Sequence, residues 1–200
     1  MNGKLPYKSF ILCILFICLL QLPHHAQTGI QLQFDRDIPQ YAFAAEEILK
    51  VFPKESGTKI ILGSQREEKT AKRMKKAGLL PDSALEAEGF TIRALENTFW
   101  ILGGDVAGAM YGGLEFAEQV RLFGIAGVQE MRKNPYMRMR GSKFNIPLDV
   151  RTPSYTDVCD AAQHNLEEMW NLDFWKAYLD RMATYRYNFV SLWNLHPFPS

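Results

Sequence analysis

The sequence has little cysteine, no excess of charge of either sign and no apolar run long enough for a comfortable membrane span. Its 200 residues include three cysteines, and 23 basic and 22 acidic side chains give a formal net charge of +1. A chain so balanced has no global electrostatic attraction to nucleic acid or anionic lipid. The hydrophobic fraction of 47% is typical of a folded globular protein and excludes a disordered one.

The N-terminus has the pattern of a secretory signal. Lys4 and Lys8 precede the apolar run Phe10 to Leu22, which is shorter than the roughly 20 residues that a membrane span needs. Residues 1–26 are therefore predicted to be a signal peptide that is cleaved after Ala26 and exports the protein to the periplasm or the extracellular space. A retained N-terminal anchor is the alternative. No stable membrane span is expected after cleavage.

The sequence predicts neither a metal site nor a cofactor. Cys13 and Cys18 leave with the signal, so Cys159 is left without an internal disulfide partner or a cysteine metal cluster. The acids and the histidine that follow in the same polar stretch match no spacing of metal ligands.

The basic cluster Lys69 to Lys76 has no aromatic residues between its charges. Stacking side chains are a usual feature of single-stranded nucleic-acid binding, so their absence argues against that role. The cluster is predicted to be the solvated face of a helix, with acids leading and bases trailing as the helix dipole favours.

The first part of the chain reads as an α/β unit. Apolar and polar residues alternate in Ile30 to Phe34, which is typical of a half-buried strand, and Glu96-Asn97 is a plausible hairpin turn. We expect strands at 30–34, 59–63, 90–94 and 99–102, and helices at 41–52, 67–77 and 107–123. This gives an α+β accessory domain over residues 27–126.

A glycine-rich turn, Gly103 to Gly108, lies between a predicted strand and a predicted helix. Such a turn holds phosphate in some folds, but neither Gly-Lys-Ser/Thr nor Gly-x-Gly-x-x-Gly is present. The favoured interpretation is structural. Asp105 caps the helix, and Gly108, Gly112 and Gly113 let it lie close on the sheet.

Residues 127–136 are predicted to be a linker, and residues 137–200 a second unit. In that unit we expect a strand from Lys143 to Leu148, a long polar loop from Asp149 to Trp170, and a helix from Asp173 to Tyr185 with Asp173 near its N-cap. A buried strand follows at Phe189 to Leu192. Strand, helix and strand in this order predict a parallel, right-handed βαβ crossover.

Polar and aromatic side chains follow both strands of that unit. Trp193, Asn194 and His196 come at the end of the second strand, and Asp149 and Arg151 follow the first. Ligand contacts in a (β/α)-barrel lie at the C-terminal ends of its strands, so these five residues are predicted to bind substrate. The structural alternatives are that Trp193 packs the barrel mouth, that His196 and Pro197 form a turn, and that Asp149 and Arg151 pair with each other.

The segment GFTIRALENTFWILGGDVAGAMYGGLEFAEQV resembles the N-terminal accessory domain of two-domain glycoside hydrolases, namely the β-N-acetylhexosaminidases (family twenty) and the α-glucuronidases (family sixty-seven). Their Gly-x-x-Tyr-Gly pattern is matched by Gly108 to Gly112. Arg140-Gly141 looks like the dipeptide that opens their catalytic barrel. The chain departs from the hexosaminidases at Asn145, where they place an aspartate.

The resemblance, which spans roughly residues 30–195, implies the N-terminal fragment of an exported glycoside hydrolase. Its fold would be α/β, with the accessory domain followed by the first βαβ portion of a truncated (β/α)8 barrel. Arg140 would contact sugar hydroxyls, and its alternative is a linker surface residue. The catalytic carboxylates would lie beyond Ser200, so the fragment alone would be inactive. The alternative function is a non-catalytic carbohydrate-binding or scaffold protein. The sequence makes no prediction about the oligomeric state.

Overall fold

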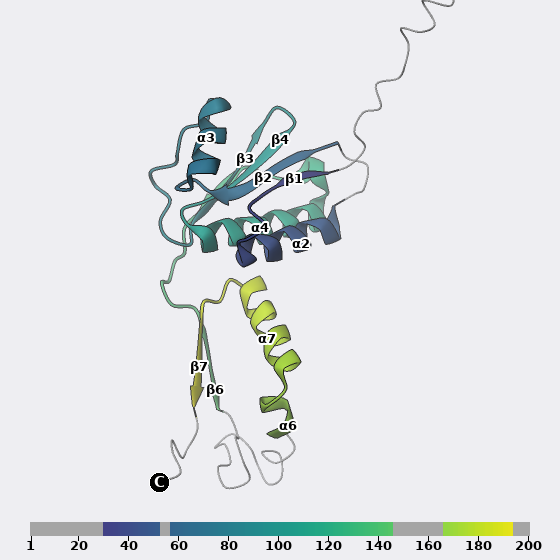
Figure 1. Cartoon of the computed structure of the whole chain (residues 1–200), viewed down its shortest axis with the longest axis vertical. Helices are drawn as coiled ribbons and strands as arrows, with labels where there is room; N and C mark the ends of the chain where they lie inside the picture. Colours follow the sequence, from purple (N-terminus) through teal and green to yellow (C-terminus); the bar gives the residue numbers. More distant parts are fainter. Residues whose placement is uncertain (1–29, 53–56, 146–165, 194–200) are drawn as a thin grey trace, which may run out of the picture.

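The computed structural model describes residues 30–52, 57–145 and 166–193, which form two units, one above the other in Figure 1. The first is a mixed α/β domain with a five-stranded sheet flanked by helices, in agreement with the predicted fold class. The second is a parallel pair of strands with helices between them in the chain. The predicted signal peptide and Cys159 lie outside the described residues. Among the residues described, no helix is long and apolar enough to cross a membrane.

The sheet of the first unit is mixed. Its strands are β1 (Gln31–Gln33), β2 (Lys59–Ser64), β3 (Phe90–Leu95), β4 (Thr98–Gly103) and β5 (Met131–Lys133). They lie in the order β1-β2-β4-β3-β5. The pairs β1–β2 and β2–β4 are parallel, whereas β3 runs antiparallel to both β4 and β5. The hairpin predicted at Glu96-Asn97 is confirmed, because Glu96 links β3 to β4 with a positive φ of 53°.

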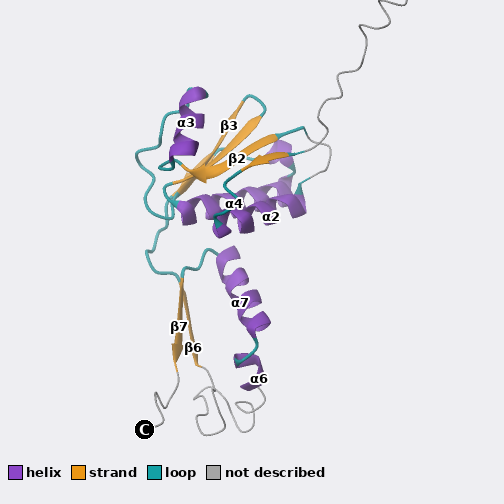
Figure 2. Cartoon of the chain, in the orientation of Figure 1, coloured by secondary structure: helices purple, strands orange, loops and turns teal. Residues whose placement is uncertain are grey.

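Helices cover both faces of this sheet (Figures 1 and 2). The helices α2 (Pro39–Val51) and α4 (Val106–Phe123) pack on one face, and α3 (Glu68–Lys76) lies on the other. Successive residues of β2 point to opposite faces, as in any strand. Ile60 and Leu62 therefore join the larger core under α2 and α4, while Ile61 packs with Met74 of α3. The lysines of α3 are exposed, as predicted for the basic cluster.

The helix α4 lies close on the sheet because two of its positions have no side chain. A Cβ atom at Gly112 would lie 2.9 Å from Cγ2 of Ile101 in β4, and one at Gly108 would lie 2.1 Å from the carbonyl oxygen of Gly89. This confirms the predicted close approach. Gly113 differs from the prediction, because a Cβ atom there would meet Ala44 of α2 at 2.8 Å. Its tightest approach is therefore to α2, and a Cβ atom there would make only an ordinary contact with the sheet, 3.6 Å from Cδ1 of Leu62.

Replacing Asp105 with alanine should lower the free energy of unfolding by about 1–2 kcal/mol. Its Oδ1 accepts a hydrogen bond from the Gly108 N–H at 2.7 Å, which confirms the predicted cap, and its Oδ2 accepts one from the Glu88 N–H at 3.0 Å. Alanine leaves both donors without this acceptor. Urea denaturation measures the change, with Asp105→Asn as the control that keeps one oxygen and loses less. An alanine variant as stable as the parent would show that the cap is dispensable.

The predicted linker 127–136 contains a strand, which corrects the sequence interpretation. Met131–Lys133 form β5 and pair with Phe90–Ile92 of β3. The Thr91 hydroxyl donates to the Met131 carbonyl oxygen at 3.0 Å, and Met131 packs against the core. The segment looked like a linker because it is short and charged. Those are also the properties of an edge strand that avoids pairing with other molecules.

The second unit consists of β6 (Gly141–Asn145), α6 (Leu166–Met169), α7 (Leu172–Thr184) and β7 (Phe189–Trp193). The two strands are parallel, as predicted, and run in register from Gly141 opposite Phe189 to Asn145 opposite Trp193. The first strand begins before the predicted Lys143. The end of the predicted loop forms the short helix α6 just before α7.

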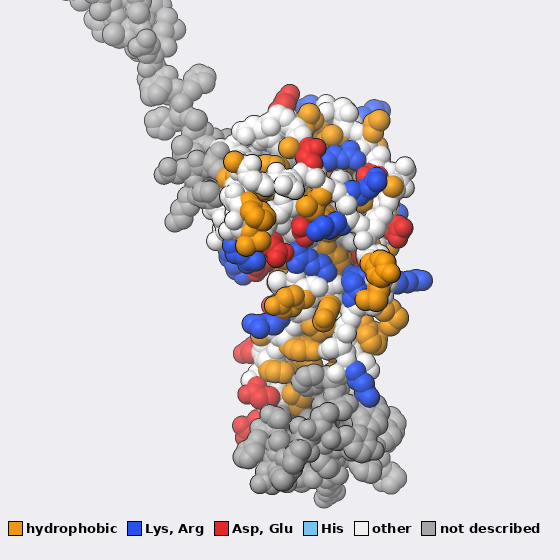
Figure 3. All heavy atoms as spheres, turned by 180° about the vertical axis from the view of Figure 1, so that it is seen from behind, with side chains coloured by type: hydrophobic (Ala, Val, Ile, Leu, Met, Phe, Trp, Pro, Cys, Tyr) orange, Lys and Arg blue, Asp and Glu red, His pale blue; other side chains and the backbone are white. Residues whose placement is uncertain are grey.

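The N-cap of α7 is Asn171, whose side-chain oxygen accepts hydrogen bonds from the Asp173 and Phe174 N–H groups. Asp173 lies in the first turn, near the N-cap as predicted. One further prediction in this unit was wrong. The final strand is not buried. Phe189 is 42% exposed and Leu192 is 48% exposed. The two lie three residues apart in the strand and therefore point to its opposite faces. Hydrophobic side chains gather on the surface of this unit (Figure 3).

Candidate functional site

Of the predicted binding residues, the structure describes Arg140 and Trp193, which lie at opposite ends of the parallel pair. Asn145 and Trp193 are register partners at the carboxyl ends of β6 and β7, so their backbones lie side by side there. Asp149 and Arg151 follow β6, and Asn194 and His196 follow β7. All four lie outside the described residues. That ligand contacts come from this end stays a prediction.

Arg140 lies at the opposite end of the strands. It immediately precedes Gly141, the first residue of β6, and its carbonyl oxygen accepts hydrogen bonds from the N–H groups of Asn188 and Phe189. Five steps along the chain at about 3.3 Å each separate it from Asn145, or about 16 Å. The structure therefore does not bring Arg140 together with the carboxyl ends of the two strands.

The guanidinium group of Arg140 binds protein groups at the junction of the two units. Its Nε donates to the Arg186 carbonyl oxygen at 2.8 Å, and its Nη1 donates to the Met137 carbonyl oxygen at 2.6 Å. Its Nη2 forms an ion pair with Glu88 at 2.5 Å. The group also lies 5.8 Å from the centre of the Tyr111 ring. With a side chain only 15% exposed, Arg140 links the first unit to the second.

Asn188 and Arg186 complete what we call the junction network, made of Glu88, Tyr111, Arg140, Arg186 and Asn188. The amide of Asn188 donates to both carboxylate oxygens of Glu88, at 2.9 and 3.0 Å. The guanidinium of Arg186 reaches Glu118 at 3.2 Å and the neighbouring Glu115 at 3.3 Å, both on α4. Burial raises the pKa of the Tyr111 hydroxyl. The network therefore ties two segments of the first unit, the residue Glu88 and the helix α4, to the residues that precede both strands of the second.

Two members of the network have unusual backbones. Glu88 and Arg186 both have a φ of 61°, in the left-handed region that favours glycine. Such conformations persist where the surrounding contacts over-determine them. Glu88 is held by its ion pair with Arg140. Arg186 is held by its ion pairs with Glu115 and Glu118. These contacts support the two left-handed conformations.

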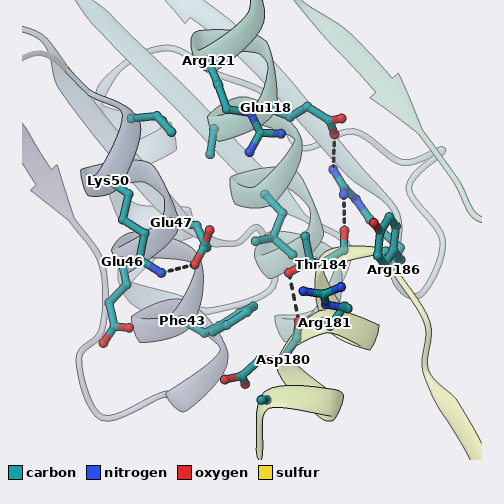
Figure 4. Close-up of a pocket in the computed structure, with 15 residues that line it drawn as sticks. Phe43, Glu46, Glu47, Lys50, Glu118, Arg121, Asp180, Arg181, Thr184 and Arg186 are labelled. Atoms are coloured by element: carbon teal, nitrogen blue, oxygen red, sulfur yellow. Dashed lines mark hydrogen bonds and ion pairs between the residues drawn. The ribbon is translucent and has the colours of Figure 1, made fainter.

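A groove of about 630 Å³ lies beside the junction network, between α2, α4 and α7 (Figure 4). Its floor is apolar, with the buried Leu114 and Ala117 of α4 and the half-buried Phe43 of α2. Acids and bases from all three helices surround this floor. The groove therefore combines a small apolar floor with a largely charged lining.

Sequence reasoning missed both the junction network and the groove. Glu88 and Asn188 are 100 residues apart, and no local pattern connects them. The lining of the groove comes from helices of both units. The hydrophobic pattern of each helix shows which of its faces is apolar, but it does not show which helices pack together. The one available signal was the Arg140-Gly141 dipeptide, which marked the junction correctly but suggested a ligand. No group of three or more potential metal ligands occurs within the described ranges.

Comparison with known proteins gives matches to solved structures alone. No protein-family model matches the sequence, and no curated protein matches it. A GH138 enzyme targeting pectin rhamnogalacturonan II is 20% identical with a TM-score of 0.57, over 84% of this chain and 24% of that one. A GH115 4-O-methyl-α-glucuronidase with specificity for decorated arabinogalactans is 15% identical with a TM-score of 0.52, over 83% and 25%.

A third structure, the GH84 protein CpGH84B, is 18% identical with a TM-score of 0.41, over 58% of this chain and 21% of that one. The chain thus spans about a quarter of the length of the solved structures that it matches. At these identities the likeness concerns the fold. The chain has the fold of a part of glycoside hydrolases such as those of families GH138 and GH115.

Proposed function

We propose that this chain is the N-terminal part of an exported glycoside hydrolase that cleaves glycosidic bonds in poly- or oligosaccharides. One observation carries the proposal. The match to the GH138 structure covers 84% of the chain, which is more than the first unit contains, so it extends into the β6–β7 unit. The match to the GH115 enzyme covers a similar share of the chain, 83%.

The second unit is, on this proposal, the beginning of a (β/α)8 barrel. Strands in such a barrel are covered by side chains inside and by helices outside. The exposure of Phe189 and Leu192 on β7 supports this assignment, because further barrel segments would cover such apolar side chains. The substrate site would lie at the carboxyl ends of β6 and β7, beyond Asn145 and Trp193. The acid and base carboxylates would come from later strands.

A second candidate is a non-catalytic carbohydrate-binding or scaffold protein built on the first unit. The observation in its favour is that the five-stranded sheet has helices of its own on both faces and a continuous core beneath α2 and α4. That unit needs no barrel to bury its apolar residues. Turnover therefore decides between the two candidates.

We expect the chain from Gln27 to Ser200 to hydrolyse no aryl glycoside, and the protein made from the complete reading frame to hydrolyse at least one. Glycoside hydrolysis needs two carboxyl groups about the scissile bond, or a substrate group in place of one. The measurement is release of 4-nitrophenol from a panel of α- and β-linked aryl glycosides, neutral sugars and uronates alike. Turnover by residues 27–200 would overturn the placement of the catalytic residues. Saccharide binding without turnover by the complete protein would favour the second candidate.

A further inference from the structure

The groove between α2, α4 and α7 contains charged side chains that the junction network does not use. Its volume of about 630 Å³ lies in the range of ligand pockets, roughly 300–1,000 Å³. It also lies where two units meet, which is a preferred position for such sites. It is distinct from the predicted substrate site, because α2 and α4 belong to the first unit and do not border the carboxyl ends of β6 and β7.

One part of the groove is acidic. Glu46 and Glu47 of α2 and Asp180 of α7 surround Lys50. The hydrogen bond that the Lys50 ammonium group donates to the Glu47 carboxylate, together with the negative charges nearby, raises the pKa of Lys50. Glu46 and Asp180 make no hydrogen bond through their carboxylates among the described residues. The carboxylate oxygens of Glu46 and Asp180 can therefore accept hydrogen bonds from a ligand.

The other part is basic. Arg121, in the last turn of α4, and Arg181, in the last turn of α7, both line the groove (Figure 4). Within the described part of the chain their side chains form no ion pair or hydrogen bond. The nearby Arg186 is different, because Glu115 and Glu118 bind it. Two guanidinium groups from different units thus face one groove with their donors unused.

We infer that this groove binds an acidic oligosaccharide through a uronate residue, with the carboxylate held by Arg121 and Arg181. The inference rests on the proposed carbohydrate function. Guanidinium groups bind carboxylates through two parallel hydrogen bonds. Sugar hydroxyls donate to the free carboxylates of Glu46 and Asp180, and the Phe43 ring offers an apolar surface to the C–H face of the sugar. A neutral sugar would leave both guanidinium groups unmatched, and an inorganic anion would leave the carboxylates of Glu46 and Asp180 without hydroxyl donors.

The test is calorimetric titration of the whole chain with trigalacturonate, and with maltotriose as the neutral trisaccharide. We expect the parent protein to bind the uronate more tightly, and the double variant Arg121→Gln, Arg181→Gln to lose at least about tenfold in affinity, as for the loss of charge-assisted contacts. Added salt should weaken binding because the contacts are exposed. Arg73→Gln is the matched control, since Arg73 lies in the last turn of α3 on the other face of the sheet.

Each other outcome contradicts the inference. Equal binding of trigalacturonate by the parent and the double variant, or binding by neither, removes the groove as a uronate site. Equal binding of triglycine would show a zwitterion or peptide site instead. Thermal unfolding of each variant confirms that it is folded. Aryl-glycoside turnover by the complete protein is a separate readout. The groove can therefore fail to bind a uronate while the proposed function stands, and the proposed function can fail while the groove binds a uronate.

Discussion

Replacing Phe116 with alanine should remove about 4 kcal/mol from the free energy of unfolding, a large share of the roughly 5–15 kcal/mol that stabilises a typical domain. The Phe116 ring is wholly buried in the core beneath α4. It stacks on Phe52 with ring centres 6.2 Å apart and meets Phe99 of β4 at 5.1 Å. Truncation leaves a cavity between a helix, the sheet and the end of α2, and none of these walls can move without losing other contacts. Urea denaturation followed by circular dichroism measures the loss.

The same helix supplies the matched control. Phe123 is 64% exposed at the end of α4, so Phe123→Ala should change the unfolding free energy by about 0.5 kcal/mol or less. Phe116→Leu keeps most of the volume and should cost less than half as much as alanine. Comparable losses at positions 116 and 123 would show that the core does not lie where the structure places it.

The second large effect is expected at the junction. Arg140→Ala should destabilise the docking of the second unit by about 3 kcal/mol, because it leaves the carboxylate of Glu88 partly buried without its cation. Hydrogen exchange at the amides of Asn188 and Phe189 is the direct measurement, since both donate to the Arg140 carbonyl oxygen. Faster exchange there, with unchanged exchange in the five-stranded sheet, is the expected pattern.

Two further variants decide what Arg140 does. Glu88→Gln alone should cost less, and the double variant should lose less than the sum of the single variants, because the two residues share one interaction. Arg140→Lys keeps the charge but cannot reproduce three directed hydrogen bonds, so it should rescue only part of the loss. If Arg140→Ala leaves exchange unchanged and abolishes saccharide binding, the resemblance-based role of Arg140 as a sugar contact is correct instead.

Most of the first unit could be predicted because its signals are local. Alternation in β1, the hairpin at Glu96-Asn97 and the cap at Asp105 each depend on residues a few positions apart. Strand β5 escaped prediction because Met-Arg-Lys has no strand pattern of its own, and its conformation follows from pairing with β3. Similarly, the apolar pattern of β7 suggested a buried strand, but the pattern does not specify which segments would cover it.

The candidate sites were predictable to a smaller extent. The register of β6 and β7 places Asn145 beside Trp193, as expected for parallel strands with their ends together. The placement of Arg140 was predicted as the start of a strand, but its partners Glu88, Arg186 and Asn188 lie 46 to 52 residues away in the sequence. A guanidinium that suits a sugar also suits a carboxylate of the protein, and composition cannot distinguish the two.

The position of β5 sets an order of events during synthesis. All five strands of the first sheet lie between Gln31 and Lys133, so this unit has every segment it needs once Lys133 has left the ribosome. Domains fold as units, with the N-terminal one first. Arg186 and Asn188 are made some fifty residues later, about the length of the β6–β7 unit. The nascent protein thus completes a folded platform, with Glu88 and Tyr111 already in place, before the segment that docks on it has been translated.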